Sequence, residues 1–288
     1  MERIDAPEPG IHKGIPIEVY LAWDLPSFHS LKEMLRSGKH YQASIANDID
    51  TEALKVGRLV DCLIFEPAEY PKRFAAHPTT YENDKGERKK WTMAARACKE
   101  MVAQMEDAGR TVISERTFAE AAAYADAVKA HPAGKKLLAD GGIAQPSLVV
   151  RDVETGVIYK NRPDWITADY AVDLKTAQAG DLRGFGLSIG RYQYHMQMAI
   201  QVDSWAALTG EELEPLFLVA EKSAAKAVAV YRLGIDSIEA GRQMFQRALL
   251  QYREAKASGV WHGYSDFIET IDAPHWALSG SLEVENVW

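Results

Sequence analysis

The order of strand-like and helix-like segments after Gly142 constrains the fold most strongly. Several stretches rich in β-branched and aromatic residues predict strands, and the first holds two runs around the turn Glu154-Thr155-Gly156. The strand-like stretches are 147–166, 171–176, 216–221 and 227–233. Helical spacing of apolar residues covers 181–208, with a break near Gly190, and 235–257. This alternation predicts an α/β or α+β fold in which helices flank a mixed central sheet.

The first half of the chain is mainly helical by the same criterion. Prolines at 7, 9, 16 and 26 predict an irregular start over 1–25, and helical spacing begins at Ser27. Further helices are expected over 51–66, over 92–104, and over 115–130, which closes at His131-Pro132. We expect one domain: an irregular and helical segment over 1–50, a helical insertion over 85–140, the sheet and its helices over 143–257, and an aromatic tail over 258–288.

Composition narrows the class of protein. The 288 residues include 33 basic and 41 acidic side chains, so the net charge of −8 excludes a simple basic coat protein for nucleic acid. It does not exclude a nuclease, because only the groove of such an enzyme must be positive. Two cysteines exclude a disulfide scaffold and suit a reducing compartment. Since the chain shows neither a leader nor an apolar run of about 18 residues, we expect a cytoplasmic protein without a membrane span.

Two carboxylates and a lysine form the sharpest local pattern. Asp164 lies near the end of one expected strand, and Asp173 lies in the next. Lys175 follows Asp173 by two positions, so both side chains point to the same face of the strand. Oxygen ligands beside an ammonium suit Mg²⁺ and a phosphate group. The alternative is a surface hairpin with a cross-strand pair between aspartate and lysine.

Asp61 interrupts an otherwise apolar stretch. The seven residues 59–65 (LVDCLIF) are apolar except for this carboxylate, which predicts a buried helix. A buried carboxylate needs a cation or another partner. Asp61 is therefore a candidate metal ligand, and a salt bridge to Arg58 or to a distant arginine is the alternative.

Two further clusters could contact a substrate. Tyr194 and Gln197 share one face of the helix after Lys175 and could reach a phosphate group or a water molecule. A basic cluster ends at Trp91, and its members are Lys85, Arg88, Lys89 and Lys90. It could track DNA phosphates while Trp91 stacks on bases, or it could be a solvated loop.

Taken together, these motifs resemble the exodeoxyribonuclease VIII (RecE-type) nucleases of the PD-(D/E)XK superfamily, which includes lambda exonuclease and the RecB nuclease domain. The motifs are 57–67 (GRLVDCLIFEP), Arg162-Pro163-Asp164, Asp173-Leu174-Lys175-Thr176 and Tyr194-His195-Met196-Gln197. The aromatic tail, with Trp261 and Trp276, is also similar to the end of that family.

The resemblance implies a restriction-endonuclease-like core and Mg²⁺-dependent digestion of linear double-stranded DNA, 5′→3′. The product would be 3′ single-stranded tails for phage-type recombination by strand annealing. Mn²⁺ could substitute for the one or two Mg²⁺ ions. By position, the metal ligands would be Asp61, Asp164, Asp173 and the Leu174 carbonyl. The catalytic groups would be Lys175, Asp173, Asp164 and Gln197, and the DNA contacts would be Lys89, Lys90, Trp91, Arg162 and Tyr194.

The same resemblance implies partners and a setting. The partners would be DNA ends, a RecT-type single-strand annealing protein, and further copies of the chain in a homo-oligomeric ring. The setting would be the cytoplasm of a bacterial or phage-infected cell.

Three positions depart from the family pattern. Asp61 stands where the family usually has His, Gln145 where it often has Glu, and Gln201 where it usually has Tyr. Two other functions therefore stay open. One is a structure-specific or restriction-like endonuclease on the same core, and the other is a catalytically silent DNA-binding protein.

Overall fold

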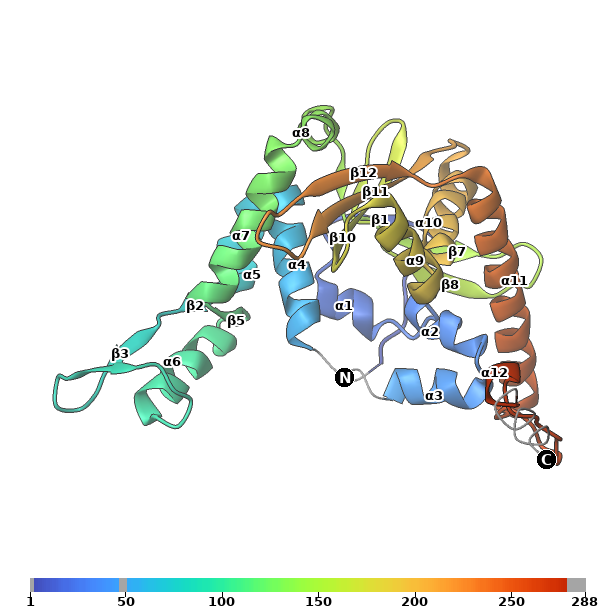
Figure 1. Ribbon diagram of the computed structural model, residues 1–288, viewed down its shortest axis with the longest axis horizontal. Coiled ribbons are helices and arrows are strands. Elements are labelled where there is room, and N and C mark those ends of the chain that lie inside the picture. Colours follow the sequence, from blue (N-terminus) through green and yellow to red (C-terminus); the bar gives the residue numbers. More distant parts are fainter. Residues whose placement is uncertain (1–2, 47–50, 279–288) are drawn as a thin grey trace, which may run out of the picture.

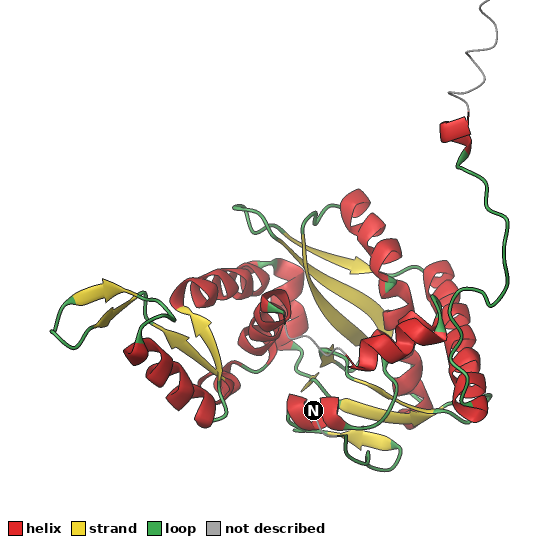
Figure 2. Ribbon diagram, turned by 90° about the horizontal axis from the view of Figure 1, so that it is seen from below, coloured by secondary structure: helices red, strands yellow, loops and turns green. Residues whose placement is uncertain are grey.

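The computed structural model describes residues 3–46 and 51–278. Figures 1 and 2 show a central body built on a twisted sheet, with an arm that projects from one side of it. The C-terminal segment also leaves the body, as Figure 2 shows. The observed mixture of helices and mixed sheet confirms the predicted fold class.

The central sheet has five strands in the order β12-β11-β10-β9-β6. The pair β10–β11 is parallel and the other pairs are antiparallel, so the sheet is mixed, as predicted. Strand β9 pairs with β10 only at Ala171 and Val172, which leaves the β9-facing edge of β10 open from Asp173 onward. The strands are β6 (Ile143–Ala144), β9 (Trp165–Ile166), β10 (Tyr170–Ala177), β11 (Glu214–Glu221) and β12 (Val228–Arg232).

Helices cover both faces of this sheet, so alternate side chains of β10 and β11 enter two different cores. Phe217 and Val219 pack with α2, α10 and α11, whereas Leu216 and Leu218 pack with α4 and α7. Asp173 and Lys175 alternate with Leu174 and therefore face α10. The helices are α2 (Phe28–Met34), α3 (Gly38–Ala46), α4 (Glu52–Phe65), α7 (Glu115–Ala130), α8 (Pro132–Ala139), α9 (Leu182–Tyr192), α10 (Tyr194–Thr209) and α11 (Ile235–Ser258).

The N-terminal region is more regular than the sequence predicted. Strand β1 (Gly10–His12) pairs with β7 (Ser147–Arg151), which forms the expected hairpin with β8 (Ile158–Asn161). Helix α1 (Ile17–Ala22) follows Pro16. The buried Lys160 ammonium donates to the carbonyls of Tyr20, Leu21 and Trp23 at 2.8, 3.0 and 2.8 Å, and so holds the end of α1. These tertiary contacts order a segment whose own pattern is irregular.

The helical insertion expected over 85–140 contains helices α6, α7 and α8, but strands β4 and β5 lie within it as well. The arm contains the parallel pair β2–β5 and the antiparallel hairpin β3–β4, whose turn is fixed by Asn83 Oδ1 accepting from the Lys85 and Glu87 amides. Strands of only three or four residues are too short to show the alternation that would reveal them. Helix α7 packs on α4 and β11 and belongs to the body. The arm elements are β2 (Phe74–His77), β3 (Thr80–Glu82), β4 (Arg88–Lys90), α6 (Arg96–Asp107) and β5 (Thr111–Ser114), and α5 (Tyr70–Arg73) leads into them.

The helices after β10 bring the last site residues into place. The break expected near Gly190 lies at Gln193, whose φ of 58° ends α9 and lets α10 start in a new direction. Gly241 of α11 faces the backbone of α10, and a Cβ there would lie 2.3 Å from the His195 carbonyl oxygen. No helix in the described ranges is long and apolar enough to cross a membrane.

Candidate active site

Asp164 and Asp173 converge where strand β9 begins beside β10. Asp164 directly precedes β9, and its Oδ2 accepts a hydrogen bond of 2.8 Å from the Leu174 amide. The Gln145 amide donates to the Asp164 carbonyl at 2.9 Å and fixes the backbone there. Because the N–H and C=O of one strand residue point to the same edge, the Leu174 carbonyl also faces the Asp164 side. Oxygen atoms of Asp164 and of Leu174 therefore lie together at the open edge of β10.

The Asp173 carboxylate is fully buried and held by three side chains. Its Oδ1 accepts from Gln197 Nε2 at 2.9 Å and from Gln201 Nε2 at 2.8 Å, and its Oδ2 pairs with the Lys175 ammonium. Lys175 Nζ also donates to Gln197 Oε1 at 3.1 Å and lies 4.6 Å from the centre of the Tyr194 ring. Strand β10 and helix α10 thus fix the lysine from several sides.

Asp61 projects from α4 into a cavity of about 680 Å³ that Asp164 and Gln197 also line. The Asp61 carboxylate makes no hydrogen bond or ion pair with any other described residue, so the structure does not show the alternative salt bridge to Arg58. Basic side chains around this cavity include Lys72, Arg73, Lys160 and Arg162. Lys72 pairs with Glu69 and Arg73 pairs with Glu66, so the wall around the carboxylates carries both signs of charge.

The local charge balance raises the pKa of both cavity carboxylates. Burial and the neighbouring Asp173 raise the pKa of Asp164 to about 7. Burial and Asp164 raise the pKa of Asp61 well above its usual range. Burial alone would lower the pKa of Lys175, but Asp173 and Asp164 outweigh it and raise that pKa. When Asp61, Asp164 and Asp173 are all ionised, their negative charge exceeds the single positive charge of Lys175.

The donor set fits a hard divalent cation. In the ranges that the structure describes, no three acidic, histidine or cysteine side chains already form a ligand cluster. However, Asp61 and the second oxygen of Asp164 make no hydrogen bonds there, and the Leu174 carbonyl lies on the same side. Oxygen donors with excess negative charge are what Mg²⁺ prefers. Asp173 could join them only by loosening its contact with Lys175.

Sequence reasoning missed three polar residues of this region. His29 on α2 lines the cavity, and Lys32 follows it by one helical turn. Desolvation by the surrounding protein, together with Lys32 and Lys175, lowers the pKa of His29 to about 4. Burial and Lys175 also lower the pKa of Lys32. Gln201 was noted only as a departure, yet it bonds Asp173 directly. Helical periodicity predicts that α2 and α10 exist but not which residues face the site.

Arg162 forms part of the cavity wall. Its Nη2 donates to the Ile15 carbonyl at 2.9 Å and to Gln145 Oε1 at 3.4 Å, and its guanidinium carbon lies 5.4 Å from the centre of the Tyr20 ring. Gln145 therefore supports an arginine instead of supplying a carboxylate. Its φ of 43° is unusual for a residue other than glycine.

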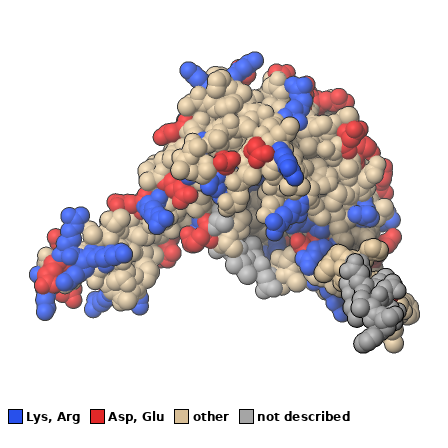
Figure 3. Space-filling view, viewed as in Figure 1, with Lys and Arg blue, Asp and Glu red and all other residues tan. Residues whose placement is uncertain are grey.

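The predicted basic cluster lies on the β3–β4 hairpin of the arm, and Figure 3 shows blue side chains with red ones among them at the tip. All three residues of β4 are exposed, and Lys89 pairs with Glu87 at 2.9 Å. The Trp91 ring stacks on His77 with centroids 4.3 Å apart, which covers one of its two faces. The structure does not bring the arm tip into the cavity that holds Asp164.

Comparison with known proteins agrees with this geometry. A family model described as a PDDEXK-like domain of unknown function (DUF3799) matches residues 27–274. A solved structure, described as a "Putative exonuclease" from Eubacterium rectale, superposes with a TM-score of 0.54 at 15% identity and covers 88% of this chain and 92% of that one. No curated protein matches the chain. The chain belongs to the PDDEXK-like DUF3799 family and has the fold of the PD-(D/E)XK nuclease superfamily.

Proposed function

We propose that this protein is a metal-dependent exodeoxyribonuclease that degrades linear double-stranded DNA. One observation carries the proposal: Asp164 and Asp173 meet across the open edge of β10, and Lys175 is held beside them by Asp173 and Gln197. Phosphodiester hydrolysis needs such a combination of oxygen ligands and a positive group near the phosphate.

Each side chain has a distinct role in this proposal. Asp61, Asp164 and the Leu174 carbonyl would hold the metal ion, and the ion would polarise the phosphate and lower the pKa of a bound water molecule. Lys175 keeps its proton at neutral pH because Asp173 and Asp164 raise its pKa. It therefore acts as a fixed positive charge that stabilises the developing negative phosphate, instead of as a general base.

The finer features rest on the resemblance to RecE-type nucleases. They are the preference for Mg²⁺ with Mn²⁺ as a substitute, the 5′→3′ direction, and 3′ tails passed to a RecT-type annealing protein in bacterial or phage recombination. Assembly into a ring belongs with them. The basic side chains around the cavity and the basic arm tip support contact with DNA phosphates.

A digestion assay tests the proposal. The full chain is incubated with 5′-phosphorylated linear duplex and with covalently closed circular duplex, each with Mg²⁺ or with EDTA. We expect loss of the linear DNA alone, only with Mg²⁺. Lys175→Ala should lower the rate by about 10²-fold or more, the usual range for a catalytic side chain. The matched control, Lys135→Ala, removes an exposed lysine of α8 and should leave the rate unchanged.

Two other outcomes would contradict the proposal, and each would assign a different function. Cutting of the circular DNA would assign an endonuclease. Binding of DNA without cleavage would assign a silent DNA-binding protein. The second alternative has a structural basis, because both oxygens of Asp173 are already engaged by Lys175, Gln197 and Gln201.

A further inference from the structure

The segment after α11 exposes large apolar side chains that the body does not cover. Phe267, Ile268 and Ile271 have relative exposures of 84%, 104% and 92%. Figure 2 shows this segment running away from the body toward α12 (His275–Leu278). Contiguous exposed apolar residues of this kind usually mark a contact with another molecule.

Acidic residues alternate with these apolar ones. Asp266, Glu269 and Asp272 lie within the same few positions, and Asp266 pairs with His262 at 2.7 Å. Glu269 and Asp272 have no ionic partner among the described residues. A partner surface for residues 266–272 should therefore combine an apolar floor with positive charge.

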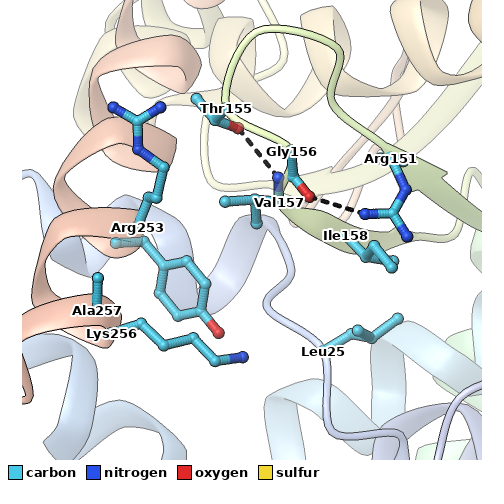
Figure 4. Close-up of a pocket in the computed structure, with 10 residues that line it drawn as sticks. Leu25, Arg151, Thr155, Gly156, Val157, Ile158, Arg253, Lys256 and Ala257 are labelled. Carbon is cyan, nitrogen blue, oxygen red and sulfur yellow. Dashed lines mark hydrogen bonds between the residues drawn. The ribbon is translucent and has the colours of Figure 1, made fainter.

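A pocket of about 430 Å³ on the body has this combination (Figure 4). It lies between the β7–β8 hairpin, the loop before α2 and the last turns of α11. Its floor includes Leu25, Val157 and Ile158. Three exposed cations surround it, namely Arg151, Arg253 and Lys256. Arg151 donates to the Gly156 carbonyl at 3.2 Å, and none of the three makes an ion pair with another described residue.

We propose that residues 266–272 of one copy of this chain dock into this pocket on a second copy. The apolar side chains would cover the floor, and the carboxylates would meet the three cations. The chain directs the segment away from its own pocket, because Trp261 stacks on Tyr41 at 5.1 Å and the Lys39 amide donates to the His262 carbonyl at 3.0 Å. The contact is head-to-tail and can repeat from copy to copy.

Charge reversal of each side tests this contact in the full chain. The pocket variant is Arg253→Glu with Lys256→Glu, and the segment variant is Glu269→Lys with Asp272→Lys. We expect the unaltered protein to self-associate in sedimentation equilibrium, and each variant to associate at least tenfold more weakly, because like charges then face each other. The control Arg247→Glu reverses an exposed charge of α11 outside the pocket and should not change association.

Mixing the two variants gives the decisive result. Each variant retains one intact surface, and the two reversed surfaces also complement each other. An equimolar mixture should therefore form assemblies that contain the two variants in equal numbers and that neither variant forms alone. All four substitutions in one chain should restore self-association. A monomer at every concentration, unchanged association of either variant, or no complex in the mixture would overturn the proposal. Binding of single-stranded DNA that the pocket variant loses, with association unchanged, would assign the pocket to nucleic acid instead.

Discussion

Gln201 supports the buried Asp173 carboxylate from 28 residues further along the chain. We predict that Gln201→Leu lowers the free energy of unfolding by about 1–3 kcal/mol, because a buried carboxylate oxygen loses one of its two amide donors. Urea denaturation measures this change. Gln104→Leu, at an exposed position of α6, is the control and should be close to neutral. Equal effects of the two variants would contradict the role of Gln201.

The raised pKa of Asp164 gives the metal-free protein a pH-dependent stability. The Asp164 carboxyl group has a pKa of about 7 in the folded state, whereas an unperturbed aspartate has a pKa of 3.8. As the pH rises, the unfolded chain therefore releases this proton at a lower pH than the folded state does. The contribution of Asp164 to stability falls between about pH 4 and pH 7. His29, whose pKa is lowered to about 4, contributes in the opposite sense over this range. The quantity to measure is therefore the stability of the unaltered protein relative to a variant without the Asp164 carboxyl group, in EDTA at pH 5 and at pH 7.

The Asp164→Asn variant isolates this contribution, because it cannot titrate. The stability of the unaltered protein relative to this variant should fall from pH 5 to pH 7. The control Asp140→Asn, at an exposed position, should keep the original pH dependence. An unchanged slope in Asp164→Asn would show that another group causes the effect.

For individual residues, the sequence predicted contacts correctly only where the spacing along the chain determines the direction of the side chains. Asp173 and Lys175 share a face because strands have a period of two residues. Asp164 could be placed near them because only a short turn separates β9 from β10. The contacts of Gln201 and His29 depend on how whole helices dock, and spacing does not determine that.

The arm is the element whose function is most accessible to experiment. We predict that Lys85→Glu, Arg88→Glu and Lys90→Glu together weaken binding to duplex DNA. Each lost phosphate contact should reduce the slope of log affinity against log salt by about 0.9. The single-turnover cleavage rate at saturating DNA should stay within about twofold, because the hairpin carries no cavity residue.

The test must distinguish the position of the reversed charges from the change in net charge. The control reverses three exposed charges of the body, at Lys135, Lys136 and Arg247. If the control weakens binding as much as the arm variant, the hairpin has no specific role in DNA binding.

Elements with clear end signals were predicted well. Pro67 and His131-Pro132 marked the ends of α4 and α7, although a second helix follows directly at Pro132. Strand β1 and the arm strands β2 to β5 were missed, because they are short and gain their order from pairing with distant segments.

Metal binding should be visible in the stability of the whole molecule. A ligand that binds only the folded state adds about 2.7 kcal/mol at a concentration of one hundred times Kd. We predict that Mg²⁺ raises the melting temperature at pH 7 and that excess EDTA reverses the rise. Asp61→Asn and Asp164→Asn should each reduce it. A Mg²⁺ shift that both variants retain would place the ion elsewhere.

The mixed sheet with helices on both faces could be predicted because the alternation of segments leaves few arrangements. The arm and the projecting C-terminal segment could not, since no local pattern says which polar segment leaves the body. The net charge of −8 likewise did not reveal the basic side chains around the cavity, because composition averages over the surface.

The order in which the site residues occur along the chain determines when the site can form during synthesis. Asp61, Asp164 and Asp173 are all translated before Gln197 and Gln201, and β10 pairs in parallel with β11, which comes later still. A nascent chain that ends after β10 therefore holds every acidic group but lacks the amides and the strand that position Asp173 and Lys175. Under the proposed nuclease function, a partly made copy on the ribosome would be inactive, and cleavage would begin only when the second half has folded onto the first.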